Sequence, residues 1–231
     1  MPKPQPPKSH HHKDKPYHHG DLRQSLLEAG LKIVREEGRE AVTLRGVARR
    51  AGVSHAAPYH HFPDKAALME ALAAEAFGRF TRILRATWRQ SPSPPLAGLA
   101  ALGEAYINFA LDYPEEFRLM HLPDLRRFGE GESSPVSMAA GEAHRVLREA
   151  VEACQQAGQI PQGDPDPYAL TAWSGVHGLA VLLLDGLLVE NCRSREEGTK
   201  LAQTLLHTLA EGLKPRPDQP PPAHTHPQGN R

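Results

Sequence analysis

The stretch from residue 43 to residue 62 constrains the fold most, because it predicts two short helices joined by a glycine turn. Leu44 and Val47 recur at helical spacing with other small apolar residues, so the first helix has one apolar face. Thr43 suits the start of this helix, since its hydroxyl can accept hydrogen bonds from the free amides of a first turn. Gly52 stands where the chain must leave the helix with a positive φ.

The second predicted helix begins after Ser54, a residue type that favours helix N-caps. Pro58 follows four positions later, near enough to the helix start that at most one backbone hydrogen bond is lost. Phe62 supplies a buried anchor, and Pro63 ends the unit before another helix begins. Two helices joined in this way form a helix-turn-helix, which lays its second helix in the major groove of DNA.

The segment TLRGVARRAGVSHAAPYHHFPDKAALMEAL resembles the DNA-binding domain of the TetR/AcrR family of bacterial transcription regulators, and the resemblance runs over about residues 17–72. Its most specific elements are Ala-Gly-Val-Ser at 51–54 and Tyr-His-His-Phe at 59–62, followed by Lys65. The chain departs from the family at 56–58, Ala-Ala-Pro, where many members carry Gly, Thr or Leu. The resemblance implies an all-α fold, with a three-helix helix-turn-helix head and a helical-bundle domain for ligand binding and dimerisation.

Polar side chains around this unit are the predicted DNA contacts, and the alternative for each is an exposed position without a ligand. The resemblance implies that Tyr59 and Lys65 contact the phosphate backbone. In the first turn of the predicted recognition helix, we expect His55 to hydrogen-bond a purine and Ala56 to pack against a thymine methyl. His61 is expected to pack beside Phe62 instead. The predicted set is Thr43, Arg45, Ser54, His55, Ala56, Tyr59, His60 and Lys65.

Charge is divided unevenly along the chain, although the formal net charge is zero. Residues 1–65 hold 12 Lys/Arg and 7 Asp/Glu, a balance of +5, and the remainder holds 15 and 20, a balance of −5. A basic head on an acidic body is typical of a polyanion-binding domain joined to a separate regulatory domain. A split of this size also arises by chance in many proteins.

Apolar residues at helical spacing, interrupted by proline and glycine, predict nine helices and no strand. Besides the two short ones, their predicted ranges are 21–38, 64–88, 96–112, 115–121, 136–157, 166–189 and 194–213. Residues 123–135 are expected to form a loop. The predicted organisation is a disordered basic arm at 1–16, a DNA-binding domain at 17–63, a ligand-binding and dimerisation domain at 64–214 and a disordered proline-rich tail at 215–231.

Several other classes of protein are not expected. The sequence has no run of eighteen apolar residues and no secretory signal, so we expect a cytoplasmic protein with no membrane partner. Cys154 and Cys192 lack metal or redox spacing, which favours reduced thiols, although a disulfide stays open. The motifs of hydrolases, phosphate loops and zinc proteases are missing, so we expect neither an enzyme nor a cofactor.

Two histidine runs, at 10–12 and 18–19, invite a metal interpretation. Consecutive histidines in a flexible segment bind divalent metals only loosely, and no carboxylate or cysteine at ligand spacing supports a structural metal site. We therefore predict no metal centre. Lys13 and Lys15 with the second run form a basic arm that lies along phosphates or enters the minor groove.

Residues 173–180, Trp-Ser-Gly-Val-His-Gly-Leu-Ala, carry a second resemblance, to the tryptophan–histidine–glycine ligand-binding domain of some TetR-type regulators. Trp173 and His177 are four residues apart and share a helix face. Either they line an effector pocket, or they are packing residues, with His177 hydrogen-bonding across a helix crossing. Further pocket candidates, of residue types that are more often core, are Tyr106, Phe109, Phe117, Met120, His121, Met138 and His144.

The family resemblance and two leucine-rich helices together predict a mechanism. Two chains are expected to associate through 166–189 and 194–213, and to present their recognition helices roughly 34 Å apart to a palindromic operator. A small apolar effector in the bundle would shift the population away from the DNA-binding state. The helix at 64–88 is expected to transmit this change, as the only element that touches both the head and the bundle. Repression is the usual behaviour of the family. The competing class is a helical protein-interaction module without specific DNA binding. The leucines expected at the dimer interface are Leu170, Leu182, Leu183, Leu187, Leu201, Leu205, Leu206 and Leu209.

Overall fold

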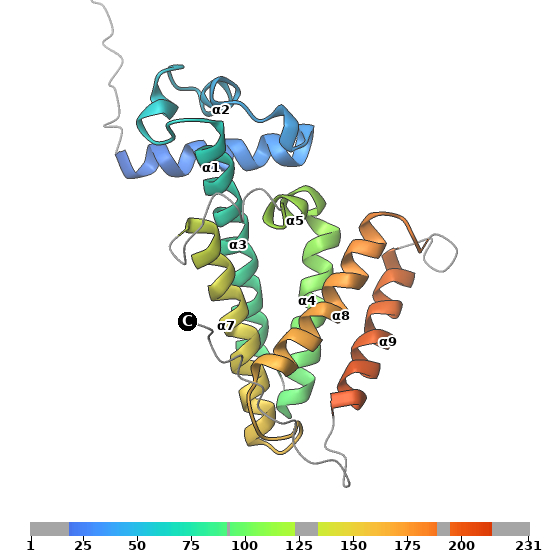
Figure 1. The fold of residues 1–231 in the computed structure, drawn as a ribbon. Helices are drawn as coiled ribbons and strands as arrows, with labels where there is room; N and C mark the ends of the chain where they lie inside the picture. The colour runs from blue at the N-terminus through green and yellow to red at the C-terminus, as the bar shows by residue number, and fades with distance from the viewer. Residues whose placement is uncertain (1–18, 92, 123–133, 189–194, 214–231) are drawn as a thin grey trace, which may run out of the picture.

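The computed structural model describes residues 19–91, 93–122, 134–188 and 195–213, which form helices without a strand (Figure 1). The all-α fold class is therefore confirmed. The α-helices are α1 His19–Glu37, α2 Leu44–Ala51, α3 Lys65–Gln90, α4 Pro95–Asp112, α5 Pro114–Met120, α7 Pro135–Gln156, α8 Asp166–Leu184 and α9 Arg195–Leu213. Two short 3₁₀ helices are η1 Arg39–Ala41 and η2 Ala57–His60.

The molecule consists of a head, formed by α1 to η2, and a helical body. Figure 1 shows α1 and α2 lying across one end of α3, which then runs down through the body beside α7. α4 packs against α3, α7, α8 and α9, so it is the central helix of the bundle. The buried apolar residues form one continuous core that extends from the head into the body.

Several predicted segments fall outside the described residues. These are the arm at 1–16, the tail at 215–231 and most of the loop at 123–135. Cys192 also lies outside them. Cys154 is buried in α7, where desolvation raises the pKa of its thiol to about 11 and keeps it protonated.

The helix ends in the head follow the predicted residue chemistry. Thr43 caps α2, its hydroxyl accepting a hydrogen bond from the Gly46 amide at 2.9 Å. Gly52 has φ 70° and lets the chain turn out of α2, where the Val53 amide donates to the Ala48 carbonyl at 3.0 Å. Asp64 caps α3 by accepting from the Ala67 amide at 2.8 Å. The turn and the entry into the long helix are thus set locally.

The predicted extent of the helix at 166–189 is wrong at its C-terminal end. α8 ends at Leu184, because Gly186 adopts φ 66° and closes the helix. The Gly186 amide donates to the Leu183 carbonyl at 3.2 Å, and the Leu187 amide donates to the Leu182 carbonyl at 3.1 Å. This is the glycine C-cap that also ends α2.

The head and the body meet at a buried carboxylate. Glu116 in α5 has a side chain with 0% exposure, and its Oε1 lies 3.3 Å from Arg35 Nη1 of α1 and 3.5 Å from Arg79 Nη1 of α3. Neither carboxylate oxygen has a hydrogen bond within the described residues, so the arginines act on it through charge. Desolvation raises the pKa of Glu116, and the charges of Arg79 and Arg35 oppose that rise.

α5 therefore links the two halves together with α3. α1 packs against both helices, and Figure 1 shows α5 directly below α1. The expectation that the helix at 64–88 is the only element touching both halves is wrong. The reason is tertiary: the chain reverses between Asp112 and Pro114 and brings Glu116 under the last turn of α1.

Candidate DNA-binding surface and effector cavity

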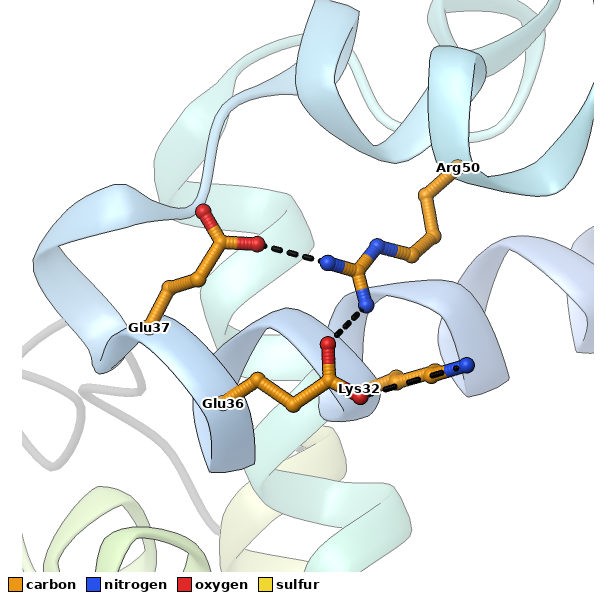
Figure 2. A network of polar contacts seen from close by, with 4 residues as sticks. All are labelled: Lys32, Glu36, Glu37 and Arg50. Carbon is orange, nitrogen blue, oxygen red and sulfur yellow. Dashed lines mark hydrogen bonds and ion pairs between the residues drawn. The ribbon is translucent and has the colours of Figure 1, made fainter.

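The head is held together by charges as well as by its apolar core (Figure 2). The Arg50 guanidinium of α2 donates to Glu36 and, at 2.6 Å, to Glu37 at the end of α1. Its hydrogen bond lowers the pKa of Glu36. Lys32 lies 3.9 Å from the same carboxylate. Arg50 is thus occupied within the head, and the sequence did not distinguish it from Arg45 and Arg49, which are exposed.

The recognition element is shorter and tighter than the α-helix predicted from Ser54 onward. The chain makes a turn at 55–56 and then the 3₁₀ helix η2. The predicted cap by the Ser54 side chain is not formed, because the N-cap residue of η2 is Ala56. Ser54 contributes its backbone instead: its carbonyl accepts a hydrogen bond from the Ala57 amide at 3.0 Å. Pro58 has no N–H to continue an α-helical ladder, which favours the 3₁₀ turn.

The structure places every residue of the predicted DNA-contact set on the surface of the head. Tyr59 and His60 project from η2, and Lys65 begins α3, where its ammonium donates to the Glu40 carbonyl at 3.4 Å. His61 is half-buried, with its ring 6.3 Å from that of Phe62. All residues of the predicted set are exposed, and we call this set the η2 surface: Thr43, Arg45, Ser54, His55, Ala56, Tyr59, His60 and Lys65.

A cavity of about 390 Å³ lies inside the body. It is enclosed by α3, α4, α7, α8 and α9, with His121 after α5. Among the described residues, its wall contains no Asp, Glu, Lys or Arg. The wall is formed by Phe77, Phe80, Leu84, Leu96, Leu99, Ala100, Leu102, Gly103, Tyr106, His121, Ala140, Gly141, Ala143, His144, Leu147, Ala172, Trp173, Val176, Leu206, Leu209, Ala210 and Leu213.

The polar side chains at one end of the cavity converge on His177. The Tyr106 hydroxyl lies 2.7 Å from His177 Nδ1 and accepts a hydrogen bond from Trp173 Nε1 at 3.3 Å. The His121 ring centroid is 4.6 Å from that of His177 and 4.5 Å from that of Phe117. The hydrogen bond from α4 to α8 therefore matches the packing role considered for His177, while Trp173 lies in the cavity wall.

The structure divides the predicted pocket residues into two groups. Tyr106, His121 and Trp173 line the cavity, as does His144. Phe109, Phe117 and Met120 are buried and stand outside its wall, as does the partly buried His177. Met138 is exposed on α7.

The leucines of α8 and α9 face opposite ways. On α8, Leu170 and Leu182 are 54% and 39% exposed, and Leu187 just beyond the helix is 69% exposed. On α9, Leu206 is buried against Gly103, and Leu209 would lie 2.6 Å from a Cβ added at Gly175.

Leu206 and Leu209, which were predicted for the dimer interface, both line the cavity, and Leu206 is buried within the chain itself. Their place in a dimer interface stays a prediction. The signal in the sequence was the pair of glycines at 103 and 175, which allow α4 and α8 to approach α9 closely enough to bury its leucines. The apolar face that stays exposed belongs to α8.

Sequence comparison identifies the family. The sequence model described as "Bacterial regulatory proteins, tetR family" matches residues 26–72, and the one described as "Tetracyclin repressor-like, C-terminal domain" matches residues 99–209. The chain belongs to the TetR family. It is therefore a helix-turn-helix transcriptional regulator, in a family of DNA-binding transcription factors rather than enzymes.

Curated relatives of this TetR-family regulator are similar over different lengths. The HTH-type transcriptional regulator SrpR of Pseudomonas putida is 25% identical over 216 residues, 85% of this chain and 87% of the relative. The nicotine-responsive transcriptional repressor HdnoR of Paenarthrobacter nicotinovorans is 39% identical over 62 residues, 27% of this chain and 32% of the relative.

Two solved structures show the same architecture. A protein of unknown function from Rhodococcus sp. RHA1 is 34% identical, with a TM-score of 0.73 over 87% of this chain and all (100%) of that one. FadR of Bacillus subtilis, solved in complex with stearoyl-CoA, has a TM-score of 0.64 over 82% of this chain and 98% of its own, at 14% identity, which shows a shared fold only.

α8 has the length and composition of a membrane span, with a mean hydropathy of 1.3. A single such helix is weak grounds for a span. In a TetR-family regulator, an apolar helix face that the chain's own core leaves uncovered is better explained by protein–protein contact.

Proposed function

We propose that this TetR-family protein is a cytoplasmic, homodimeric repressor that binds a palindromic operator and is released by a small effector in the cavity. The observation that carries the proposal is the pairing of the exposed η2 surface with a cavity-containing body, linked through α3 and α5. The proposed division follows the same line, with the DNA-binding domain at 17–63 and the ligand-binding and dimerisation domain at 64–214.

In the proposed complex, Tyr59 and Lys65 hold phosphates on either side of the groove entrance. Tyr59 offers its hydroxyl from η2, and Lys65 offers its charge from the first turn of α3. Base readout falls to His55 and Ala56 in the turn before η2, the exposed residues nearest the start of the recognition element.

The proposed dimer forms through the exposed apolar face of α8. Between Leu170 and Leu182 on this face lie Ser174 and Gly178, and a Cβ added at Gly178 would meet nothing within 4 Å in the described chain. Small residues flanked by leucines let a second helix approach closely. A two-fold axis that passes through this face and runs along the length of the body would present the two heads on the same side of the dimer.

The proposed signal passes from the cavity to the head through α5. The Phe117 ring contacts that of His121, which lines the cavity, and the neighbouring Glu116 is paired with Arg35 of α1. An effector that moves His121 therefore moves the helix whose carboxylate holds the last turn of α1. Two conformations of the helical body that differ in their affinity for the effector are sufficient for release of the operator.

Selection of duplexes from random DNA tests the proposal directly. We expect enrichment of an inverted repeat with half-sites about one helical turn apart. Affinity for the selected duplex is expected to fall steeply with salt, by about a thousandfold between 50 and 200 mM, if six or more phosphates are contacted. Selection without an enriched motif would favour the protein-interaction module.

Tyr59→Phe and Lys65→Ala test the backbone contacts. Each variant is expected to weaken operator binding roughly tenfold, because each removes one charged or charge-assisted hydrogen bond to phosphate. In Lys65→Ala the slope of log affinity against log salt should also fall by about one. Fluorescence anisotropy with the selected duplex measures both.

Lys200→Ala is the matched control, since this lysine is exposed on α9 and pairs only with Glu196 within the described contacts. It should bind like the unchanged protein. Wild-type affinity in both η2-surface variants would refute this placement of the phosphate contacts.

A further inference from the structure

The shape of the cavity limits the molecules that it can hold. Its wall follows α4 from Leu96 to Tyr106, a distance of about 15 Å at the rise of an α-helix. α3 contributes Phe77 to Leu84 along the same direction, and α9 contributes Leu206 to Leu213. A volume of about 390 Å³ along several helix turns is that of a narrow, elongated ligand rather than a compact one.

The chemistry of the wall limits the charge of the ligand. Within the described part of the chain no acidic or permanently basic side chain lines the cavity, and its titratable groups are histidines at 121 and 144 and a tyrosine at 106. A cationic ligand buried here would find no acidic side chain as a counter-charge. An anionic ligand would find no permanently basic side chain and could be paired only by a protonated histidine.

Three of the four polar side chains of the wall gather around one ring, and the fourth is His144 on α7. Tyr106, Trp173 and His121 surround the His177 ring, whose centroid is 6.2, 5.9 and 4.6 Å from theirs. The wall on α4 from Leu96 to Leu102 carries only apolar residues. Apart from His144 on α7, the polar side chains of the wall therefore lie beside one part of a ligand, and the wall along α4 from Leu96 to Leu102 offers it only hydrocarbon.

From these three features we infer that the effector is an uncharged, elongated hydrophobic molecule with one hydrogen-bonding group at its end, such as a fatty alcohol, ketone or ester. This inference rests on the proposed function of the cavity as the effector site. The polar end of the ligand lies beside Tyr106 and His121. His121 directly follows α5 and its ring contacts Phe117 of that helix, so the polar end of the ligand is bound next to the helix that carries Glu116.

The opening of the cavity lies along α7. Gly141 and His144 line the cavity and are also exposed, and a Cβ added at Gly141 would meet nothing within 4 Å. A larger side chain at Gly141 therefore has room to extend across the opening without disturbing the packing of the helix. In a helix interior this replacement also removes the flexibility of glycine, so the fold should tolerate it.

Three ligands with the same hydrocarbon chain test the inference on the full-length protein: 1-decanol, decanoate and decyltrimethylammonium, all below their micelle concentrations. Calorimetric titration at about pH 8.5, where an imidazole is ordinarily neutral, should give the tightest binding for 1-decanol, by at least about tenfold over either ion. At this pH only the ions leave a buried charge without a counter-charge. Equal or tighter binding of decanoate or of the ammonium ion would overturn the inference.

Two variants locate the ligand within the cavity. Gly141→Leu should weaken 1-decanol binding about tenfold or more, whereas Gly212→Leu, at an exposed helical glycine with nothing within 4 Å, should not change it. Tyr106→Phe should reduce the preference for 1-decanol over decane, because it removes the hydroxyl at the polar end. Unchanged binding in both cavity variants would place the ligand elsewhere and refute the inference.

Operator binding measured on the same samples separates this inference from the proposed function. Tight 1-decanol binding that leaves the operator complex intact would support the ligand class and refute release by an effector in this cavity. Failure of 1-decanol to bind a protein that still binds its operator would refute the ligand class while leaving DNA recognition supported.

Discussion

Leu182→Asp should convert the protein into a monomer that binds its operator at least a hundredfold more weakly. Leu182 is exposed in the last turn of α8, on the apolar face of the helix, so in the proposed dimer it is covered by the second copy. An aspartate there would be buried without a partner in both protomers, at a cost of about 3–5 kcal/mol for each uncompensated charge. Without the dimer, the second head loses an effective-concentration advantage of about 10²–10⁴.

Sedimentation velocity and operator anisotropy at the same protein concentration measure these two effects. Met138→Asp is the matched control, because Met138 is an equally apolar side chain with 62% exposure on α7, away from the proposed interface. It should remain dimeric and bind DNA normally. A Leu182→Asp protein that sediments as a dimer would show that α8 is not the contact surface.

Arg79→Met should be the most destabilising substitution at the junction between head and body. It leaves the buried Glu116 carboxylate with Arg35 as its one remaining cation among the described contacts. Because the Arg79 side chain is 30% exposed, solvent screens part of the loss, and we expect about 2–3 kcal/mol of destabilisation at neutral pH, below the value for a fully buried pair. The methionine keeps much of the packing beside Tyr113, whose ring lies 5.1 Å from the guanidinium.

Glu116→Gln provides the matched test, since it removes the buried charge and keeps the shape of the side chain. The double variant Arg79→Met/Glu116→Gln should recover most of the stability lost in Arg79→Met, because an uncharged amide no longer needs the arginine. Denaturant unfolding of the unchanged protein, the two single variants and the double variant measures the coupling free energy between the two residues. Additive losses in the double variant would show that Arg79 acts through packing and not through the carboxylate.

The same residue gives a defined pH dependence. Desolvation raises the pKa of Glu116 above its ordinary value of 4.5, so the folded state holds this proton more tightly than the unfolded state does. The penalty for ionised Glu116 is therefore full above the folded-state pKa and disappears as the pH falls toward 4.5.

Glu116→Gln should accordingly be more stable than the unchanged protein at pH 8, and the difference in free energy of unfolding should shrink at pH 5. Glu36 does not interfere in this range, because its pKa is lowered and its contribution is lost only below the ordinary value. A difference that grows on acidification would contradict the assigned direction.

Local sequence chemistry predicted the parts of this protein that are built from adjacent residues. The cap at Thr43, the turn at Gly52 and the exposed residues that follow depend on contacts within a few positions, which a single sequence contains. The resemblance supplied the family, and the family models agree with it. The fold class followed from helical periodicity alone. The DNA contacts themselves remain predictions.

Tertiary structure decided the features that depend on residues far apart in the chain. In the sequence Arg50 cannot be told apart from Arg45 and Arg49, and only the packing of α2 on α1 shows that it pairs with Glu36 and Glu37. Leucine periodicity on α9 showed an apolar face but not its partner, and the closeness of α9 to Gly103 and Gly175 turned that face into a cavity wall. The sequence by itself therefore determined most of the α-helices and the turn at Gly52, but not the 3₁₀ form of η2 or the end of α8. Only the packing of those helices determined the cavity, the buried Glu116 and the exposed face of α8. The reason is that the burial of a side chain depends on its neighbours in space and not on the spacing of residues along the sequence.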